Sequence, residues 1–439
     1  MKDQAAPGEG PGATPERLST RETAERLGVK PETVYAYVSR GQLSSRRAPG
    51  GRGSTFDAAE VDALARRSGR RASSPATGDL LFRTGITLIE SDRYYFHGVD
   101  ATALAGQYGY EEVAEWLWTG ELRPGIRFSA PGEALAAARR AVDALPAHCG
   151  STDRLRVAVV AASTTDPLRF DLSREAVLAG ARSLIPTLVG ALPPAAGSPS
   201  SGNGSAKETG GKGATLARQL WPKLTACPAE EPSIAVLDTA LALLIDHDLA
   251  ASTLAARVAA SAHAHPYAVV SAGLGVLEGP LHGAASGLAH RMLAEVLERG
   301  SAAPVVADRL RAGHRIPGLG HRLYASEDPR AQALFALLAE VPQAASALAA
   351  ARDVVTTTAR HTPLHANVDL ALAALSVSSG MAAEAGETVF AVARTAGWIA
   401  HALEEYGERP LRLRPSGQYE GPRPPQPLPL PPVTVGPSA

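Results

Sequence analysis

From Tyr110 onward, apolar and polar positions follow helical spacing, in long alanine- and leucine-rich runs that glycine and proline interrupt. Because apolar residues that recur every three to four positions form one face of a helix, this pattern predicts an all-α domain. One stretch before Tyr110 does not follow this helical pattern. GITLIESDRYYFHGV, residues 85–99, alternates on both sides of the turn residues Ser91 to Arg93 and predicts a small β-hairpin.

A separate short unit precedes the hairpin. In LSTRETAERLGVKPETVYAYVSRGQL, residues 18–43, Ser19 and Glu22 have the spacing of a capping box, which satisfies backbone N–H groups at the start of a helix. Pro31 is typical of the first position of a second helix. RRAPGGRGSTF, residues 46–56, then predicts a hairpin or wing before a further helix. This order resembles the winged helix-turn-helix domain of the MerR and excisionase type.

The resemblance implies that the second helix enters the major groove of DNA. The expected DNA contacts are Lys30, Thr33, Tyr35, Arg40, Arg46, Arg47 and Arg52. Short helix-turn-helix units also mediate protein contacts, and this second helix offers few side chains suited to reading base edges. A protein partner therefore stays an alternative.

Basic residues are concentrated in the same unit. Residues 17–71 hold twelve arginine or lysine side chains against six acidic ones, whereas the whole chain has a formal net charge of −1 at pH 7. The rest of the chain is therefore acidic on balance. A basic unit of this kind favours an anionic partner such as nucleic acid.

Composition marks the boundaries between parts of the chain. Its ends are rich in proline and small residues and are predicted to be disordered, and residues 193–215 are predicted to be a low-complexity surface insertion. The predicted order is a disordered N-terminus (1–16), a helix-turn-helix domain (17–71), a linker (72–80), the all-α domain (81–422) and a disordered tail (423–439).

Cysteine usage and hydropathy are typical of a reducing compartment. Cys149 and Cys227, the only cysteines, have neither metal-ligand spacing nor the pattern of a disulfide framework. No signal peptide opens the sequence, and the apolar stretch at 234–245 is interrupted by Asp238 well short of a membrane span. We therefore expect a cytoplasmic protein without a metal site.

Polar stretches rich in His and Arg interrupt the apolar helices. They are DHDLAAST (246–253), GPLHGAASG (279–287), PGLGHRLYASEDPRA (317–331), HANVDLALAAL (365–375), FAVARTAGWIAHALEEY (390–406) and RLRPSGQYEGP (412–422). Taken singly, each is explained by a capped helix end or an ion pair. Taken in order, they resemble the citrate synthase family, whose sequences carry a DHE segment, GPLHGG, GFGHRVY with DPRA, PNVD, ARTVGWIAH and a final RP element.

The resemblance runs from about Gly85 to Pro422 and implies both fold and activity. It implies a large helical domain (81–282 and 386–422) and a small helical domain (283–385), with the small hairpin in front and the active site between the domains. The implied enzyme is an acyltransferase that condenses acetyl-CoA or propionyl-CoA with oxaloacetate, giving citrate or 2-methylcitrate and CoA. It is implied to be a homodimer, or a higher oligomer of dimers, and to need no cofactor.

The resemblance also assigns roles to residues. Asp369 is implied as the base that takes the α-proton of the acyl group, His282 as the donor to the enolate oxygen, and His321 as the donor to the ketone oxygen of oxaloacetate. A dianionic substrate calls for forked, permanently charged donors. The implied substrate-binding residues are His247, Arg330, Arg394 and Arg414. In the family the last arginine crosses the dimer interface, so Arg414 would serve the neighbouring subunit.

Several neighbours of these residues depart from the family pattern. They are Ala250 for Asn, Ala284 and Ser286 for Gly and Asn, Ala366 for Pro, Leu370 to Leu372 for Phe-Tyr-Ser, and RPSGQY in place of RPRxxY. Because a single methylene is worth only about 1 to 3 kcal/mol of discrimination, the acyl-CoA preference stays open.

A second function is compatible with the same sequence. The chain would then be a DNA-binding regulator whose citrate synthase-like domain senses a metabolite. Retention of Asp369, His282 and His321 favours catalysis, since a sensor could keep the arginines and lose the base. The two functions do not exclude each other.

Overall fold

The computed structural model describes residues 17–27, 29–39, 42–47, 54–58, 60–61, 64, 82–197, 213–279, 282–324, 326–413 and 420. The chain divides into two compact units, Met1–Arg83 and Thr84–Ala439. Each unit has a buried hydrophobic core of its own. The predicted disordered ends, the linker at 72–80 and most of the predicted insertion lie outside the described residues.

The first unit has the predicted helix, turn, helix and wing. Its elements are β1 (Arg17–Ser19), α1 (Thr20–Leu27), α2 (Pro31–Ser39), β2 (Ser45–Arg47) and β3 (Ser54–Asp57). The strands form an antiparallel sheet in the order β1-β3-β2. The capping box is confirmed, because Ser19 N–H donates to Glu22 Oε2 at 2.7 Å and Glu22 N–H donates to Ser19 Oγ at 3.3 Å.

A small core holds this unit together. Leu18 from β1, Val34 from α2 and Phe56 from β3 are among its buried side chains. Polar contacts add to this core. The carboxylate of Glu60 accepts hydrogen bonds from the backbone N–H and the hydroxyl of Ser44, at 3.0 and 3.1 Å. Glu60, three residues after the end of β3, is thereby tied to Ser44, which directly precedes β2.

The second unit is helical apart from one small sheet, as predicted. Its described elements are β4 (Thr87–Glu90), β5 (Arg93–Phe96), β6 (Val99–Asp100), α4 (Ala101–Gln107), α5 (Tyr110–Thr119), α6 (Gly132–Asp143), α7 (Ser151–Ser163), α8 (Arg174–Ala191), α9 (Leu216–Leu224), α10 (Glu231–Leu243), α11 (Ala251–Ser261), α12 (Pro266–Leu277), α13 (Ala285–Arg299), α14 (Ala302–Arg311), α15 (Pro329–Leu338), a 3-10 turn (Pro342–Ala344), α16 (Ala345–Ala359), α17 (Val368–Ser378) and α18 (Ala385–Tyr406). The predicted hairpin is confirmed, with Glu90 paired to Arg93 across its turn.

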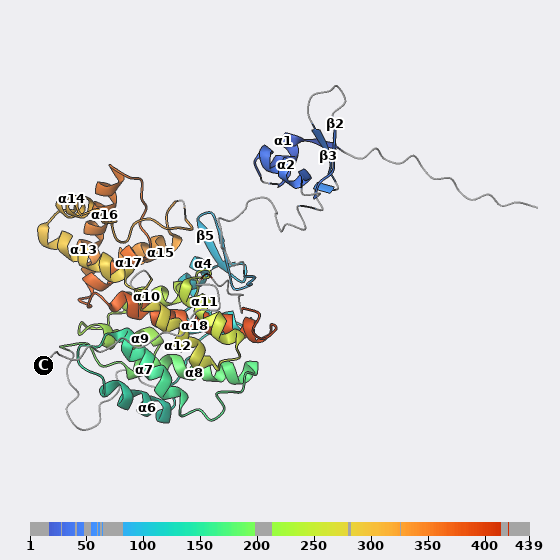
Figure 1. The fold of residues 1–439 in the computed structure, drawn as a ribbon. Helices are drawn as coiled ribbons and strands as arrows, with labels where there is room; N and C mark the ends of the chain where they lie inside the picture. The colour runs from blue at the N-terminus through green and yellow to red at the C-terminus, as the bar shows by residue number, and fades with distance from the viewer. Residues whose placement is uncertain are drawn as a thin grey trace, which may run out of the picture. The chain divides into compact units, whose positions relative to one another are not determined.

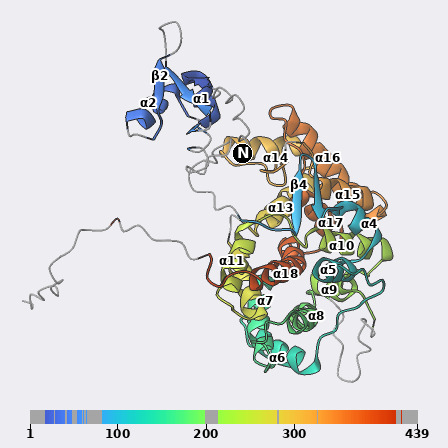
Figure 2. The ribbon, with the colours of Figure 1, turned by 90° about the vertical axis from the view of Figure 1, so that its right-hand side faces the viewer.

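Helix α18 lies at the centre of this unit. Figures 1 and 2 show α6 to α9 gathered on one side of it and α13 to α17 on the other. Every residue from 391 to 400 is buried, as expected for a helix that is apolar on all faces. The centre of α18 can therefore hold a polar side chain away from bulk water.

Small residues let neighbouring segments approach α18 closely. A Cβ on Gly397 would lie 2.0 Å from the carbonyl oxygen of Ile245, and a Cβ on Gly273 of α12 would lie 2.6 Å from the ring of Trp398. The turn after α10 therefore packs backbone to backbone against α18. This contact brings residues 245–247 next to the middle of the central helix.

Helix α5 fixes α18 by side-chain hydrogen bonds. Tyr110 Oη donates to the carbonyl oxygen of Val392 at 3.2 Å, and Trp118 Nε1 donates to that of Ala396 at 2.9 Å. Both bonds are buried. They hold the segment of α18 that carries Arg394.

Within the described residues, no single helix is both long enough and apolar enough to cross a membrane. Two helical segments, Pro329–Leu338 and Pro342–Ala359, reach that length and hydropathy only together and are bent by 116°.

Candidate active site

The turn after α10 presents His247 beside a buried carboxylate. Asp246 accepts hydrogen bonds from Thr87 Oγ1 at 2.5 Å and from His401 Nε2 at 3.2 Å. Burial alone would raise the pKa of Asp246, but His401, Arg394 and Thr87 outweigh it and lower that pKa. Asp246 is therefore an anion inside the fold.

Two imidazoles and a phenol form a compact cluster next to this turn. The ring centroids of His247 and His321 lie 5.2 Å apart at right angles, and the ring of Tyr324 lies 4.8 Å from His321. His247 Nε2 lies 2.7 Å from Tyr324 Oη in a buried hydrogen bond. Burial, followed by the charges of Arg330 and Arg394, holds the pKa of His247 well below its ordinary value. His247 is therefore neutral at physiological pH.

Local contacts indicate which nitrogen of His321 carries its proton. The backbone N–H of Leu323 donates to His321 Nδ1 at 3.1 Å. Burial and then Arg330 lower the pKa of His321, so the ring is neutral. A neutral imidazole whose Nδ1 accepts a hydrogen bond carries its proton on Nε2, so the 3.4 Å approach of Arg330 Nη2 to that nitrogen is a contact between two donors and not a hydrogen bond. That N–H is the group available to donate to a substrate oxygen.

Arg330 is held by its own neighbour Asp328. Arg330 Nε and Nη2 donate to the two oxygens of that carboxylate at 3.0 and 2.8 Å. Asp328 Oδ2 also accepts the backbone N–H of Val368, at 3.0 Å. Burial would raise the pKa of Asp328, but Arg330 outweighs it and lowers that pKa. Asp328 therefore joins the first turn of α15 to the first turn of α17.

Arg394, at the centre of α18, is buried and only partly paired. Its Nε donates to the carbonyl oxygen of Leu244 at 2.9 Å, and its guanidinium lies over the ring of Phe390, 4.5 Å from the centroid. Arg394 Nη1 is buried and has no hydrogen-bond partner among the described residues. Burial lowers the pKa of Arg394 to about 10, which leaves it charged at pH 7. A buried guanidinium N–H group without an acceptor is costly unless a ligand supplies one.

Asp369 lies at the start of α17, two residues after the N-cap residue Asn367. Its backbone N–H donates to Asn367 Oδ1 at 3.0 Å, while its carboxylate makes no hydrogen bond or ion pair with the described residues. Burial raises the pKa of Asp369 to about 6, against the lowering effect of Arg330. Such a carboxylate is a stronger base than an ordinary aspartate.

His282 lies in the turn before α13 and is oriented by Ser252. The distance from His282 Nε2 to Ser252 Oγ is 2.8 Å, and the ring of Phe390 lies edge-on, 5.9 Å from that of His282. Burial and then Arg394 lower the pKa of His282, so it too is neutral. Phe390 therefore touches both His282 and Arg394.

A buried ionic network supports the turn that carries His247. Arg257 of α11 contacts His401 Nδ1 at 2.9 Å and donates to Glu404 Oε2 at 2.6 Å and to Glu405 Oε2 at 3.1 Å. His401 in turn contacts Asp246. The network thus links α11 and the end of α18 to the site.

The structure brings several of the predicted site residues into contact. His247, His321 and Arg330 lie in one cluster, and Phe390 connects Arg394 to His282. Among the described residues, Asp369 and His282 share no direct contact; Arg330 acts on the pKa of Asp369, and Arg394 acts on that of His282. Arg414 lies outside the described residues.

Sequence reasoning missed five residues that shape this site. They are Asp246, Ser252, Tyr324, Asp328 and His401. All five lie inside the polar stretches that were singled out, so their positions could have been noticed. Their partners could not, because most are 30 to 159 residues away in the sequence.

The predicted DNA-binding residues that the structure describes lie directly before α2, on α2 and on the wing. Lys30, Arg46 and Arg47 are exposed, Thr33 is half-buried, and half of the surface of Tyr35 is exposed. Arg40 and Arg52 lie outside the described residues. No group of three or more His, Cys, Asp or Glu side chains suited to a metal ion occurs among the residues that the structure describes.

Comparisons with known proteins agree with this division. The family model of the citrate synthase C-terminal domain matches residues 77–416, and that of a helix-turn-helix domain matches residues 17–69. Both domains that the sequence resembles are thereby confirmed.

Curated relatives carry names from the same family. Citrate synthase 2 of Bacillus subtilis is 35% identical over 202 residues, 44% of this chain and 53% of that protein. Citrate synthase of Haloferax volcanii is 29% identical over 365 residues, 78% of this chain and 94% of that protein. 2-Methylcitrate synthase of Mycobacterium tuberculosis is 26% identical over 347 residues, 74% of this chain and 84% of that protein. The match thus spans about half of the Bacillus protein and nearly all of the Haloferax protein.

Solved structures show the same fold. Citrate synthase from Pyrobaculum aerophilum has a TM-score of 0.65 at 21% identity, covering 88% of this chain and 97% of that one. Citrate synthase from Thermoplasma acidophilum, solved as a ternary complex with carboxymethyl coenzyme A and oxaloacetate, has a TM-score of 0.63 at 21% identity, covering 80% and 96%. The predicted all-α fold is confirmed. The chain belongs to the citrate synthase family and carries a helix-turn-helix domain ahead of the synthase region.

Proposed function

We propose that this protein condenses the acyl group of acetyl-CoA or propionyl-CoA with oxaloacetate and releases CoA together with citrate or 2-methylcitrate. Family membership supports the reaction class. The observation that carries the proposal is Arg394, a buried cation with an unpaired Nη1 beside neutral imidazoles. Such a site is suited to an anion with a reactive carbonyl rather than to a cation or an apolar molecule. The proposed reaction needs no cofactor beyond its substrates.

Oxaloacetate would be held by its two carboxylates. Arg394 offers Nη1 to one of them, and Arg330, pre-oriented by Asp328, offers the part of its guanidinium that Asp328 leaves open. His247 completes this set, and Arg414 of a neighbouring subunit is the further arginine that the family resemblance implies. Because the arginines are already ordered by protein contacts, little side-chain entropy would be lost on binding.

The chemistry needs a base and two hydrogen-bond donors. In the proposed mechanism, Asp369 takes the α-proton of the thioester while His282 donates to the oxygen that becomes the enolate. The α-carbon then attacks the ketone carbon of oxaloacetate, and the Nε2–H of His321 donates to the ketone oxygen as negative charge grows there. Water finally cleaves the thioester and releases CoA. The raised pKa of Asp369 supports its role as the base.

The departures from the family pattern support no choice between the two acyl-CoA substrates. Leu370 is fully buried and packs against Gly318, and Ser286 is buried against Gly386. Both side chains therefore contribute to helix packing behind the site. The relatives include proteins named for either product, so acyl preference has to be measured.

A thiol-release assay tests the proposal. Purified protein with oxaloacetate should release free CoA from acetyl-CoA, propionyl-CoA or both. Asp369→Asn should lower kcat by about 10²- to 10⁴-fold, because it removes the base and keeps the shape. Asp143→Asn, at an exposed position on α6, is the matched control and should keep full activity. No release with either thioester would contradict the proposal.

A second candidate function, DNA binding, is favoured by the helix-turn-helix match and by the exposed Arg46 and Arg47 on β2. We propose it as an addition to catalysis rather than a replacement. The test is a mobility shift whose affinity falls steeply with salt. Deletion of residues 1–83, the first compact unit, should abolish the shift and leave CoA release intact. A shift that survives the deletion would place the nucleic-acid contact elsewhere.

We also propose that the second unit forms a homodimer. The family resemblance supports this proposal. Val160 of α7 and, in the loop that follows, Leu168 and Phe170 each expose 56 to 69% of their surface, which is apolar area that a subunit contact would bury. Light scattering on purified protein would measure the mass directly. A monomer at micromolar concentration would rule out a site shared between subunits.

A further inference from the structure

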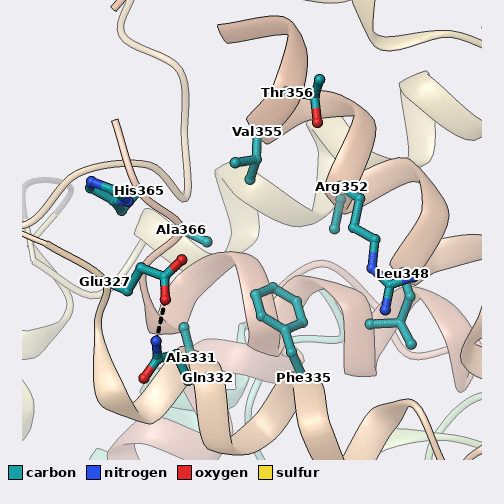
Figure 3. A pocket seen from close by; sticks show the side chains of 11 residues that line it. Glu327, Ala331, Gln332, Phe335, Leu348, Arg352, Val355, Thr356, His365 and Ala366 are labelled. Carbon is teal, nitrogen blue, oxygen red and sulfur yellow. Dashed lines mark hydrogen bonds between the residues drawn. The ribbon is translucent and has the colours of Figure 1, made fainter. Parts of the chain in front are cut away.

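A cavity of about 430 Å³ lies between α15 and α16, and none of the residues proposed for catalysis or substrate binding is among those that line it. Phe335 from α15 and Leu348, Ala351 and Val355 from α16 form its apolar lining. Figure 3 shows the ring of Phe335 below Val355, with Arg352 at one end of the opening and His365 at the other. The volume is within the range of small-molecule sites.

The two ends of the cavity opening carry side chains of opposite charge, Arg352 and Glu327. Arg352 is exposed, and its guanidinium makes no hydrogen bond or ion pair with the described residues. Across the cavity, the carboxylate of Glu327 accepts a hydrogen bond from the side-chain amide of Gln332 (Figure 3). One end of the opening therefore offers a free cation, while the carboxylate at the other end is already engaged.

We infer that this cavity binds a small organic monocarboxylate with an apolar body. The body would lie on Phe335, Leu348 and Val355, and the carboxylate would meet Arg352 in the forked geometry that arginine favours. A polyphosphate such as CoA, or a tricarboxylate such as citrate, is disfavoured because one arginine faces them together with the Glu327 carboxylate. The site is therefore separate from those of the substrates and products.

The cavity is joined to the proposed active site through the backbone. Glu327 directly precedes Asp328, which holds Arg330. On the other side, the carbonyl oxygen of His365 accepts the N–H of Gly320 at 2.8 Å, and Ala366 pairs with Leu319. A ligand there touches both segments that carry His321, Arg330 and Asp369. If the proposed function holds, its occupancy changes the KM for oxaloacetate.

Binding is tested on the full chain without any assay of activity. Isothermal calorimetry with octanoate should give saturable binding of one molecule per chain. Arg352→Gln should weaken it at least tenfold, and Val355→Phe, which fills the cavity, should abolish it. Arg140→Gln, at an exposed site on α6, is the matched control and should bind as the native protein does. Octanamide, which lacks the charge, should bind at least tenfold more weakly than octanoate.

The outcomes separate this inference from the proposed reaction. Lack of saturable octanoate binding, or binding that Arg352→Gln leaves unchanged, would overturn the site. Displacement of octanoate by acyl-CoA in a competitive manner would also overturn it, because the cavity would then belong to a substrate. Binding with no change in the KM for oxaloacetate would uphold the site and overturn its coupling to catalysis.

Discussion

The carboxylate of Asp369 is held in a state that favours proton abstraction at neutral pH. Burial raises its pKa to about 6, and only the deprotonated form can act as a base. We predict that kcat/KM falls about tenfold per pH unit below pH 6 and levels off above pH 7. A pH–rate profile with oxaloacetate and the better acyl-CoA measures this. A profile that stays flat down to pH 5 would exclude Asp369 as the titrating base.

The same pKa shift predicts an effect on stability. A carboxyl whose pKa is raised by folding destabilises the folded state wherever it is ionised, so the cost is present above about pH 6 and vanishes below about pH 4. A shift of this size corresponds to about 2 to 3 kcal/mol. Asp369→Asn should therefore raise the free energy of unfolding at pH 8 but not at pH 4. Urea denaturation at both pH values tests the sign.

Tyr324 is predicted to position His247. Its hydroxyl contacts His247 Nε2 at 2.7 Å inside the cluster, and a hydrogen bond of this kind contributes about 0.5 to 1.5 kcal/mol. Tyr324→Phe keeps the ring and should raise the KM for oxaloacetate about five- to tenfold, with kcat changed less. Steady-state kinetics of the variant and the native protein measure both constants. A lowered KM would instead mean that the hydroxyl competes with the substrate for His247.

For single residues of the site, the sequence allowed us to predict which polar side chains take part but not which of them contact one another. The resemblance pointed to His321 and Arg330, which do lie within 3.4 Å of each other. The bidentate bond from Arg330 to Asp328 was readable in principle, since the two residues are only two positions apart. The contact of Asp246 with His401 was not, because it spans 155 residues and depends on how α10 and α18 pack.

Among the helices, the packing of α18 depends on the absence of a single side chain. A Cβ on Gly397 would lie 2.0 Å from the backbone oxygen of Ile245, in the turn that leads to His247. We predict that Gly397→Ala destabilises the protein by about 3 kcal/mol and lowers activity, since backbone has to move to make room. The free energy of unfolding and CoA release measure the two effects.

Gly106 of α4 provides the control for that substitution. A Cβ there would meet nothing within 4 Å. Gly106→Ala should therefore stabilise the protein by about 0.5 to 1 kcal/mol, because alanine loses less conformational freedom in a helix. If both variants had the same stability, close packing at Gly397 would not be the cause.

Secondary-structure elements were predictable where residues close together in the sequence determine them. The hairpin around Ser91 and the capping box of Ser19 with Glu22 were both predicted and observed. Asp57 and Glu60 have the same spacing as that box, and the N–H of Glu60 does donate to Asp57 Oδ1 at 3.4 Å. Its carboxylate, however, accepts from Ser44, a contact that only the fold of the wing creates. The partner of the Glu60 carboxylate is therefore set by tertiary structure and not by the local spacing of Asp57 and Glu60.

For the molecule as a whole, composition predicted two parts of opposite charge, and the chain does divide into two compact units. The boundary between a large and a small helical domain, at 283 and 385, stays a prediction, as does the cytoplasmic location. The domain boundary does not follow from residue patterns, because a boundary within continuous helical packing leaves no change in composition.

The proposed dimer leads to a prediction about shared sites. If each site takes Asp369 from one subunit and Arg414 from its partner, Asp369→Asn and Arg414→Gln are each inactive alone. A mixed dimer then has one doubly altered site and one native site. Random exchange of subunits makes half of the dimers mixed, so about a quarter of native activity should return.

Subunit exchange is carried out by mixing the two variants in mild denaturant, followed by dilution and a CoA-release assay. The control pairs Asp369→Asn with His282→Ala. Because these two residues serve the same site from the same chain, no mixed dimer contains a native site, and activity should stay absent. Recovery in the first mixture alone supports a site built across the interface. Without recovery there, despite exchange verified by differently tagged subunits, Arg414 would act within its own chain and each subunit would be a complete enzyme.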